Sequence, residues 1–256
     1  MAAASNAETI VFCGGISPRL EGEEMKVDEP GFKGGDRTMI ELPQSQRDVL
    51  AALHKAGKRV VLVLCSGSAI GLVPEQQTAD AILQAWYGGQ AGGQALAEVL
   101  FGKVNPSGRL PVTFYRSVDQ LPDFEDYNME GHTYRFFRGE PLYPFGHGLS
   151  YSRFVYGKPR FADGKLTLSV ANKSKRDGEE TVLVYINKVG DTDGPVRTLR
   201  AFQRVEVAAG GSREVTIPLP DSAFEWWDPA SNAMRILPGQ YIVQVGKHKL
   251  RIKRGQ

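Results

Sequence analysis

Three glutamates lie within four positions of one stretch of this sequence, at Glu21, Glu23 and Glu24. The stretch runs from Gly14 to Thr38 and reads GGISPRLEGEEMKVDEPGFKGGDRT. Its glycines allow the backbone to approach a ligand closely. A carboxylate on such a loop acts as a general acid when burial or neighbouring charges raise its pKa. The same residue types also fit a solvated acidic loop, so the residue types alone leave both interpretations open.

Charged residues on either side of the glutamates are candidates for supporting this loop. Asp36 and Arg37 are adjacent in the chain and can orient the loop through an ion pair, or clamp it without touching a ligand. Arg19 precedes Glu21 by two positions and is a candidate anchor. We therefore treat Arg19, Asp36 and Arg37 as support for the loop.

The first half of the chain supplies the elements that must position these residues. Strand-like and helix-like segments alternate there, at Thr9–Cys13, Ser45–Lys55, Arg59–Cys65, Ala81–Tyr87 and Gly92–Gly102. The segment Arg59–Cys65 (RVVLVLC) is apolar throughout, as expected of a strand buried on both faces. This order predicts an α/β layer with a mostly parallel sheet. The acidic loop follows the first strand, where such folds place their sites.

The pattern changes in the second half of the chain. Residues 116–153 are rich in Asp, Pro, Gly and aromatics and have no period, which is typical of a linker or a strap. From Phe154 onward apolar residues alternate with polar ones, and turn signals separate about seven short strands. We therefore predict an α/β domain over residues 1–115, a strap over 116–153 and an all-β, immunoglobulin/fibronectin III-like sandwich over 154–256.

Composition excludes several classes of protein. The 256 residues carry a formal net charge of +2 with both signs interspersed, so nucleic acid is not an expected partner. No apolar run is long enough for a membrane span. The first residues, MAAASNAETIVF, have neither the basic region nor the apolar core of a secretory signal.

Other residues with reactive side chains do not lie in the sequence motifs that a catalytic or metal site requires. Cys13 and Cys65 lie in no CxxC motif and near no histidine cluster, so we expect buried free thiols without a metal or redox role. Ser66 and Ser68 do not form the G-x-S-x-G pattern of a serine hydrolase. Trp86 and Tyr87 end a predicted strand, and we expect them to pack in the core rather than stack on a sugar.

Five segments together resemble one family of enzymes. In chain order they contain GISPRLEGEEM with GFKGGDRT, then VLCSGSAIGLVPE, AWYGGQAGGQALAEVLFGKVNPSGRLPVTF, GHTYRFFRGEPLYPFGHGLSYSRF and a stretch from Leu199 to Pro218. This combination and order are similar to the C-terminal part of glycoside hydrolase family 3, the β-xylosidases and β-glucosidases. The resemblance implies a partial α/β sandwich followed by a fibronectin type III-like domain.

The resemblance also assigns roles. Enzymes of this family hydrolyse terminal β-linked sugars with retention, with an Asp nucleophile on an N-terminal (β/α)8 barrel and an acid/base on a loop of the α/β domain. The acid/base is the second Glu of a pattern like E-x-E-G-x-D-R in many members. Glu21-Gly22-Glu23 and Gly35-Asp36-Arg37 match its two parts, so the role falls on Glu23. The insert Glu24–Gly34 separates these parts, which leaves Glu24 and Glu21 as alternatives.

For the protein as a whole, the resemblance implies an oligosaccharide substrate and no cofactor or metal. The barrel and its nucleophile are missing from this chain, so we expect no activity from the chain alone. A β-xylosidase is favoured by the long loop and by YRSVDQLPDFEDYNM. The alternatives are a β-glucosidase, an α-L-arabinofuranosidase, or a non-catalytic module that binds a glycan or a partner. The resemblance places the parent protein in the periplasm or outside the cell.

Overall fold

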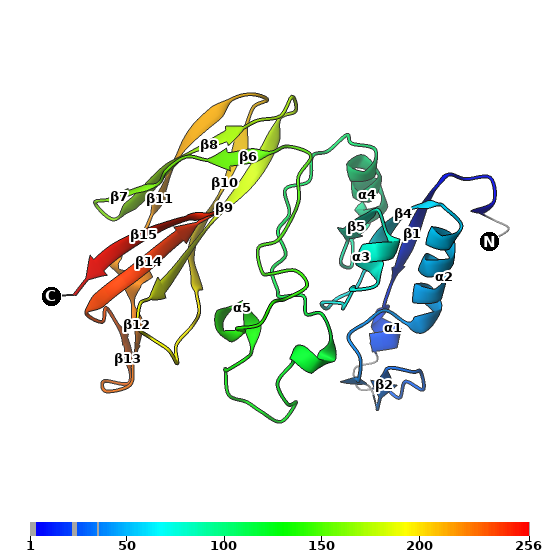
Figure 1. The fold of residues 1–256 in the computed structure, drawn as a ribbon, viewed down its shortest axis with the longest axis horizontal. Helices are drawn as coiled ribbons and strands as arrows, with labels where there is room; N and C mark the ends of the chain where they lie inside the picture. The colour runs from blue at the N-terminus through cyan, green and yellow to red at the C-terminus, as the bar shows by residue number, and fades with distance from the viewer. Residues whose placement is uncertain (1–3, 22–24, 35, 256) are drawn as a thin grey trace. The chain divides into compact units, whose positions relative to one another are not determined.

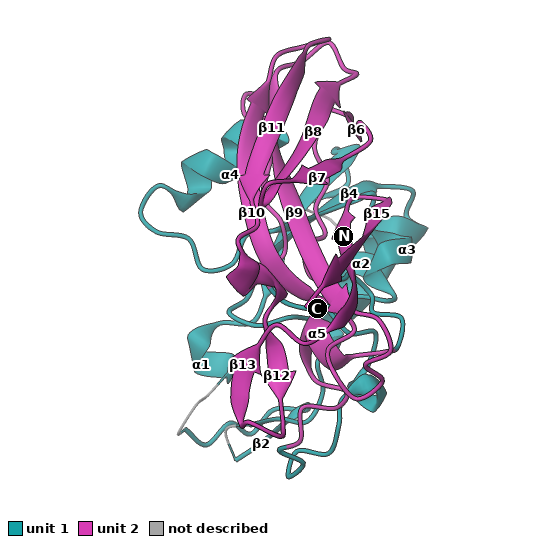
Figure 2. Cartoon of the chain, turned by 90° about the vertical axis from the view of Figure 1, so that its left-hand side faces the viewer, with its two compact units in different colours: residues 1–101, 112–127, 139–144 teal, residues 102–111, 128–138, 145–256 magenta. Residues whose placement is uncertain are grey.

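The computed structural model describes residues 4–21, 25–34 and 36–255. The chain divides into two compact units, coloured separately in Figure 2. The first unit contains residues 1–101, 112–127 and 139–144, and the second contains residues 102–111, 128–138 and 145–256. The segment predicted as a strap, 116–153, is thus shared between both units.

A three-stranded parallel sheet forms the centre of the first unit, in the order β1-β4-β5. Figure 1 shows α2 running alongside β1 and β4. The unit contains, in chain order, β1 (Thr9–Gly15), α1 (Pro18–Glu21), β2 (Phe32–Lys33), β3 (Asp36–Arg37), α2 (Gln44–Lys55), β4 (Arg59–Cys65), α3 (Glu75–Thr78), β5 (Ala81–Gln84), α4 (Gly92–Leu100) and η2 (Val118–Gln120). The predicted mostly parallel α/β layer is confirmed for this unit.

Strand β4 is the buried centre of this sheet because it has a neighbour on each side. Val60, Leu62, Val63 and Leu64 have no exposed surface. Strand β5 is shorter than predicted and ends at Gln84. The physical reason is Trp86, whose φ of 55° lies in the left-handed region and turns the chain out of the extended conformation.

The thiols of the first unit differ from their prediction in one respect. Cys13 and Cys65 are both free, as expected, but Cys13 is exposed and Cys65 is only partly buried. Cys13 lies on β1, an outer strand of the sheet, where every second residue faces outward. Val11 on the same face is 50% exposed. The prediction of a buried Cys13 was wrong because this face of β1 is open in the chain.

The second unit consists mainly of antiparallel sheets. Its elements are α5 (Thr133–Phe136), β6 (Phe154–Tyr156), β7 (Arg160–Ala162), β8 (Lys165–Asn172), β9 (Gly178–Lys188), β10 (Thr198–Val207), β11 (Ser212–Pro218), η3 (Asp221–Phe224), β12 (Trp226–Asp228), β13 (Ala233–Arg235), β14 (Gly239–Val245) and β15 (His248–Arg254). One sheet has the order β10-β9-β14-β15, and the other joins β11, β8 and β6, with β7 also paired to β8.

One hydrophobic core lies between these two sheets. Alternate residues of β8 are buried, and the side chains of Leu166, Leu168 and Val170 pack with those of Val182 and Val184 from β9. This is the period of two that the sequence predicted. The chain therefore combines an α/β unit with a unit made mainly of β-strands. None of the helices in the described part of the chain is long and apolar enough to cross a membrane.

A buried amide joins two turns at one end of the second unit. Asn172 has no exposed surface. Its Nδ2 donates to the carbonyl oxygens of Arg176 (2.7 Å) and Val207 (3.1 Å), and its Oδ1 accepts from the Ser174 amide (3.0 Å). All three bonds join the Asn172 side-chain amide to backbone groups.

We predict that Asn172→Ala lowers the free energy of unfolding by about 1–3 kcal/mol, because it removes three hydrogen bonds, of which the one to the Val207 carbonyl is buried. Urea denaturation of the purified chain measures this change. Lys173→Ala is the matched control, since Lys173 is exposed and adjacent. An unchanged midpoint for Asn172→Ala would contradict the role of this amide.

Candidate active site

The predicted acidic loop begins where β1 ends and continues through the short helix α1. Glu21 is the last residue of α1 and is partly buried. Glu23 and Glu24 lie outside the described residues, so their roles stay predictions. Arg19 is exposed on α1, and Asp36 is exposed on β3. The described part of the loop therefore places Glu21 and Arg37 as the two partly buried charged residues of the predicted set.

Each oxygen of the Glu21 carboxylate lies within hydrogen-bond distance of a protein hydroxyl. The Ser68 hydroxyl donates to Oε1 at 3.1 Å, and the Tyr87 hydroxyl lies 3.0 Å from Oε2. Ser68 follows β4 and Tyr87 follows β5, whose carboxyl ends meet at one edge of the parallel sheet. The sheet thus brings together residues that are 47 and 66 positions from Glu21 in the chain.

Arg37 fastens the other end of the loop to the same hydroxyl. Its Nη1 donates to Ser68 Oγ at 2.9 Å and to the Ala69 carbonyl at 3.4 Å, and its Nε donates to the Met39 carbonyl at 3.1 Å. Burial lowers the pKa of the Arg37 guanidinium, while the nearby carboxylate of Glu21 opposes that shift. No ion pair joins Asp36 to Arg37 among the described residues. Arg37 therefore clamps its end of the loop. We call the two described ends of the loop, residues 16–21 and 36–39, the loop stem.

One donor of Arg37 is still available. The Nη2 atom is buried and has no hydrogen-bond partner in the part of the chain that the structure describes. A buried guanidinium donor without a partner costs free energy. The atom lies on the guanidinium that holds the loop stem, so a group of the loop or of a ligand that reaches it gains a charge-assisted bond.

Backbone constraints hold the start of the loop against the sheet. Gly15 has a φ of 134°, and a Cβ there would lie 1.8 Å from the Cys65 carbonyl oxygen. The side-chain amide of Gln46 on α2 accepts from the Gly15 amide (2.8 Å) and donates to the Gly15 carbonyl (2.7 Å). Ile16 then donates to the Cys65 carbonyl at 3.0 Å. The chain consequently leaves β1 in one fixed direction toward Glu21.

Tyr87 and Ser68 are functional candidates that the sequence analysis missed. Tyr87 was expected in the core, but its ring is 44% exposed and its hydroxyl reaches Glu21. Burial raises the pKa of Tyr87, and the hydrogen bond to Glu21 raises it further. Ser68 was weighed as a nucleophile and not as a hydrogen-bond donor. A signal existed for both, because each directly follows a strand of the parallel sheet.

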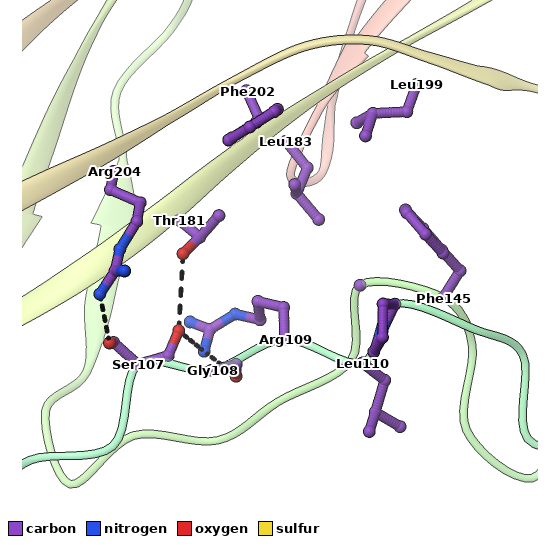
Figure 3. A pocket seen from close by; sticks show the side chains of 12 residues that line it. Ser107, Gly108, Arg109, Leu110, Phe145, Thr181, Leu183, Leu199, Phe202 and Arg204 are labelled. Carbon is purple, nitrogen blue, oxygen red and sulfur yellow. Dashed lines mark hydrogen bonds between the residues drawn. The ribbon is translucent and has the colours of Figure 1, made fainter. Parts of the chain in front are cut away.

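The second unit contains a hollow of different character, drawn in Figure 3. Its volume is about 320 Å³. Arg109 donates to Glu180 at 2.6 Å, while Arg204 donates to Ser107 at 3.1 Å and contacts Glu179. The rest of the lining is mostly apolar, from Leu110, Pro111, Phe145, Leu183, Leu199 and Phe202. Because its guanidinium groups are already engaged, this hollow offers no evident acid or base.

No group of three or more His, Cys, Asp or Glu side chains that could hold a metal ion occurs among the described residues. A carboxyl group on this loop can offer proton transfer, and a hydroxyl and a guanidinium fix the described ends of the loop.

Comparisons with known proteins agree with the sequence resemblance. Residues 1–151 match the family model described as the glycosyl hydrolase family 3 C-terminal domain, and residues 180–249 match a fibronectin type III-like domain. A xylan 1,4-β-xylosidase of Xylanibacter ruminicola is 50% identical over 247 residues, covering 94% of this chain and 29% of that protein. A periplasmic β-glucosidase of Salmonella typhimurium is 38% identical, covering 87% of this chain and 32% of that protein.

Solved structures give the same result. A β-glucosidase of Bifidobacterium adolescentis superposes with a TM-score of 0.83 and 30% identity, over 98% of this chain and 39% of that one. A family 3 exo-β-xylosidase bound to a xylobiose aziridine probe has a TM-score of 0.84 and 26% identity, over 100% of this chain and 37% of that one. The chain thus spans about a third of the length of these relatives. It belongs to glycoside hydrolase family 3, whose C-terminal domain model it matches.

Proposed function

We propose that this chain supplies the general acid/base of a retaining exo-β-glycosidase of the β-xylosidase type. The nucleophile would lie on a (β/α)8 barrel in the remaining two thirds of the enzyme. The observation that carries this proposal is the network of Glu21, Ser68, Tyr87 and Arg37, which fastens both ends of the loop bearing Glu23 to one sheet edge. A fixed stem is what an acid/base needs, because proton transfer depends on placement.

Glu23 is the proposed acid/base, and the geometry of Glu21 supports this choice. Both Glu21 oxygens already lie within hydrogen-bond distance of protein hydroxyls, which suits a supporting role. Glu23 follows it by two positions in the sequence. Glu24 is the remaining alternative. In this proposal Arg37 clamps the loop, and Asp36 and Arg19 support it.

In the reaction, Glu23 would protonate the glycosidic oxygen while the nucleophile attacks the anomeric carbon. The resulting carboxylate would then take a proton from the water that releases the sugar. Retaining enzymes hold the two carboxyl groups about 5–5.5 Å apart, so the loop and the barrel must meet across the substrate. Neither carboxyl group performs the double displacement without the other.

A terminal β-xyloside is the proposed substrate because the 50% identical relative is named a xylan 1,4-β-xylosidase. A terminal β-glucoside is the second candidate, favoured by the 38% identical relative named a periplasmic β-glucosidase. That relative also supports the proposal that the parent protein works in the periplasm or outside the cell.

We propose a finer description of the domains on the same basis. The first unit would be part of an α/β sandwich whose sheet continues beyond β1, since β1 pairs only with β4 among the described residues and its other edge is unpaired. The second would be an immunoglobulin/fibronectin III-like sandwich over 154–256, and residues 116–153 would strap the chain. Strap residues bond within each unit, as Tyr143 does with Phe114 in the first and Tyr134 does with Leu199 in the second.

The purified chain should not hydrolyse an aryl β-xyloside, because it lacks the proposed nucleophile domain. Release of the chromogenic phenol should equal that from the same chain carrying Glu23→Gln. Turnover by the wild-type chain above this control would contradict the division of the catalytic groups between two domains.

A second test joins the chain to the N-terminal part of its enzyme and replaces Glu23 with Gln. We predict that kcat/KM for xylobiose falls by about 10²–10⁴-fold, because the poor leaving group needs a proton. The value for a dinitrophenyl β-xyloside should fall far less, since that leaving group departs as an anion. Glu24→Gln is the matched variant and should leave the ratio of the two substrates near wild type. Equal losses on both substrates for Glu23→Gln would count against its role.

A further inference from the structure

We propose that Tyr87 is a positioning residue that sets the acid/base loop through its hydroxyl bonds to the loop stem. This inference rests on the proposed function and adds to it a residue that acts on the reaction through Glu21. The hydroxyl lies 2.7 Å from the Ile16 carbonyl and 3.0 Å from Glu21 Oε2. One side chain therefore bridges the two ends of the segment that includes α1.

Both contacts of this bridge depend on one atom, the Tyr87 hydroxyl oxygen, and they differ in length. Tyr87 has a single hydroxyl proton and faces two acceptors. Its shorter contact is to the Ile16 carbonyl, so the Glu21 carboxylate depends also on the Ser68 hydroxyl at 3.1 Å. Removal of the Tyr87 oxygen would take one contact from the start and one from the end of the segment 16–21, while the bonds of Ile16 to Cys65 and of Ser68 to Glu21 stay.

The strained backbone of Trp86, the residue before Tyr87, sets the direction of the Tyr87 side chain. Trp86 has a φ of 55°, which is rare for a bulky residue and is a strained conformation. Such a conformation persists only where its surroundings over-determine it. The Trp86 ring packs edge-on against Phe114, with ring centroids 6.3 Å apart, and Phe114 is only 1% exposed. Core packing of Trp86 thus holds the turn that presents Tyr87.

Gly67 provides the space for the same contact. A Cβ at this position would lie 2.9 Å from Tyr87 Cε2 and 3.3 Å from Glu21 Oε2. The residue has no positive φ, so the need for glycine here is steric and not conformational. Absence of a side chain at Gly67 and the turn at Trp86 both serve one contact between Tyr87 and Glu21.

The far end of the loop is coupled to the same place. Ser68 donates to Glu21 and accepts from Arg37, so one hydroxyl joins the residues that bracket positions 22–36. Among the described residues, loss of the Tyr87 contact would leave Ser68 as the one hydrogen-bond donor to the Glu21 carboxylate. Glu23 would then be attached to a stem with greater freedom, and misplacement of a catalytic group by about 1 Å can cost up to about a hundredfold in rate.

The first test uses the chain as it is. Tyr87→Phe should speed tryptic cleavage after Lys26 several-fold, while Tyr127→Phe should not change it. Tyr127 is a matched control because its side chain is 92% exposed. Unchanged cleavage in Tyr87→Phe would overturn the inference, whatever the enzymatic role of the loop.

The second test uses the joined enzyme. Tyr87→Phe should lower kcat/KM for xylobiose by about tenfold and leave the value for a dinitrophenyl β-xyloside near wild type, as expected for a displaced general acid. Equal losses on both substrates would overturn a positioning role and indicate a general structural one. Glu23→Gln is measured in parallel, so that failure of the two proposals can be told apart. If the rate loss in Glu23→Gln does not depend on the leaving group, the proposed function fails. The tryptic cleavage test still decides the role of Tyr87 in that case.

Discussion

The Ser68 hydroxyl is the point on which the candidate site depends. It donates to Glu21 and accepts from Arg37, and thereby ties the outgoing and returning ends of the acidic loop to the carboxyl end of β4. A parallel sheet provides such an edge because its strands all end on the same side. The backbone constraint at Gly15, where β1 ends, places the loop at this edge, and the turn at Trp86 places Tyr87 there.

Much of the architecture is local in origin and could be predicted from the sequence. The strand Arg59–Cys65 has the predicted bounds because a short apolar run rich in β-branched residues favours a strand buried on both faces. The alternation in β8 is equally direct, since burial of every second residue follows from the pleat. The family motifs carried the resemblance that the comparisons confirmed.

The hydrogen bonds that support the candidate site could not be predicted from the sequence in the same way. Glu21 meets Ser68 and Tyr87 across 47 and 66 positions, and no local pattern encodes those contacts. The left-handed backbone at Trp86 has no sequence signal, because bulky residues rarely adopt it and the Phe114 ring that Trp86 contacts is far away in the sequence. The exposure of Cys13 was missed for a related reason, since an apolar run does not reveal whether both faces of a strand are covered. Assignment of the acid/base among the glutamates still rests on the family motif.

The central claim is that Glu23 is the acid/base of a retaining enzyme, and one product analysis tests it most directly. In the joined enzyme with Glu23→Gln, the covalent glycosyl intermediate has no base to activate water, but azide needs none. The account predicts that azide accelerates turnover of an activated aryl β-xyloside and that the product is a xylosyl azide of β configuration. Absence of this product, or its formation with Glu24→Gln instead, would contradict the account.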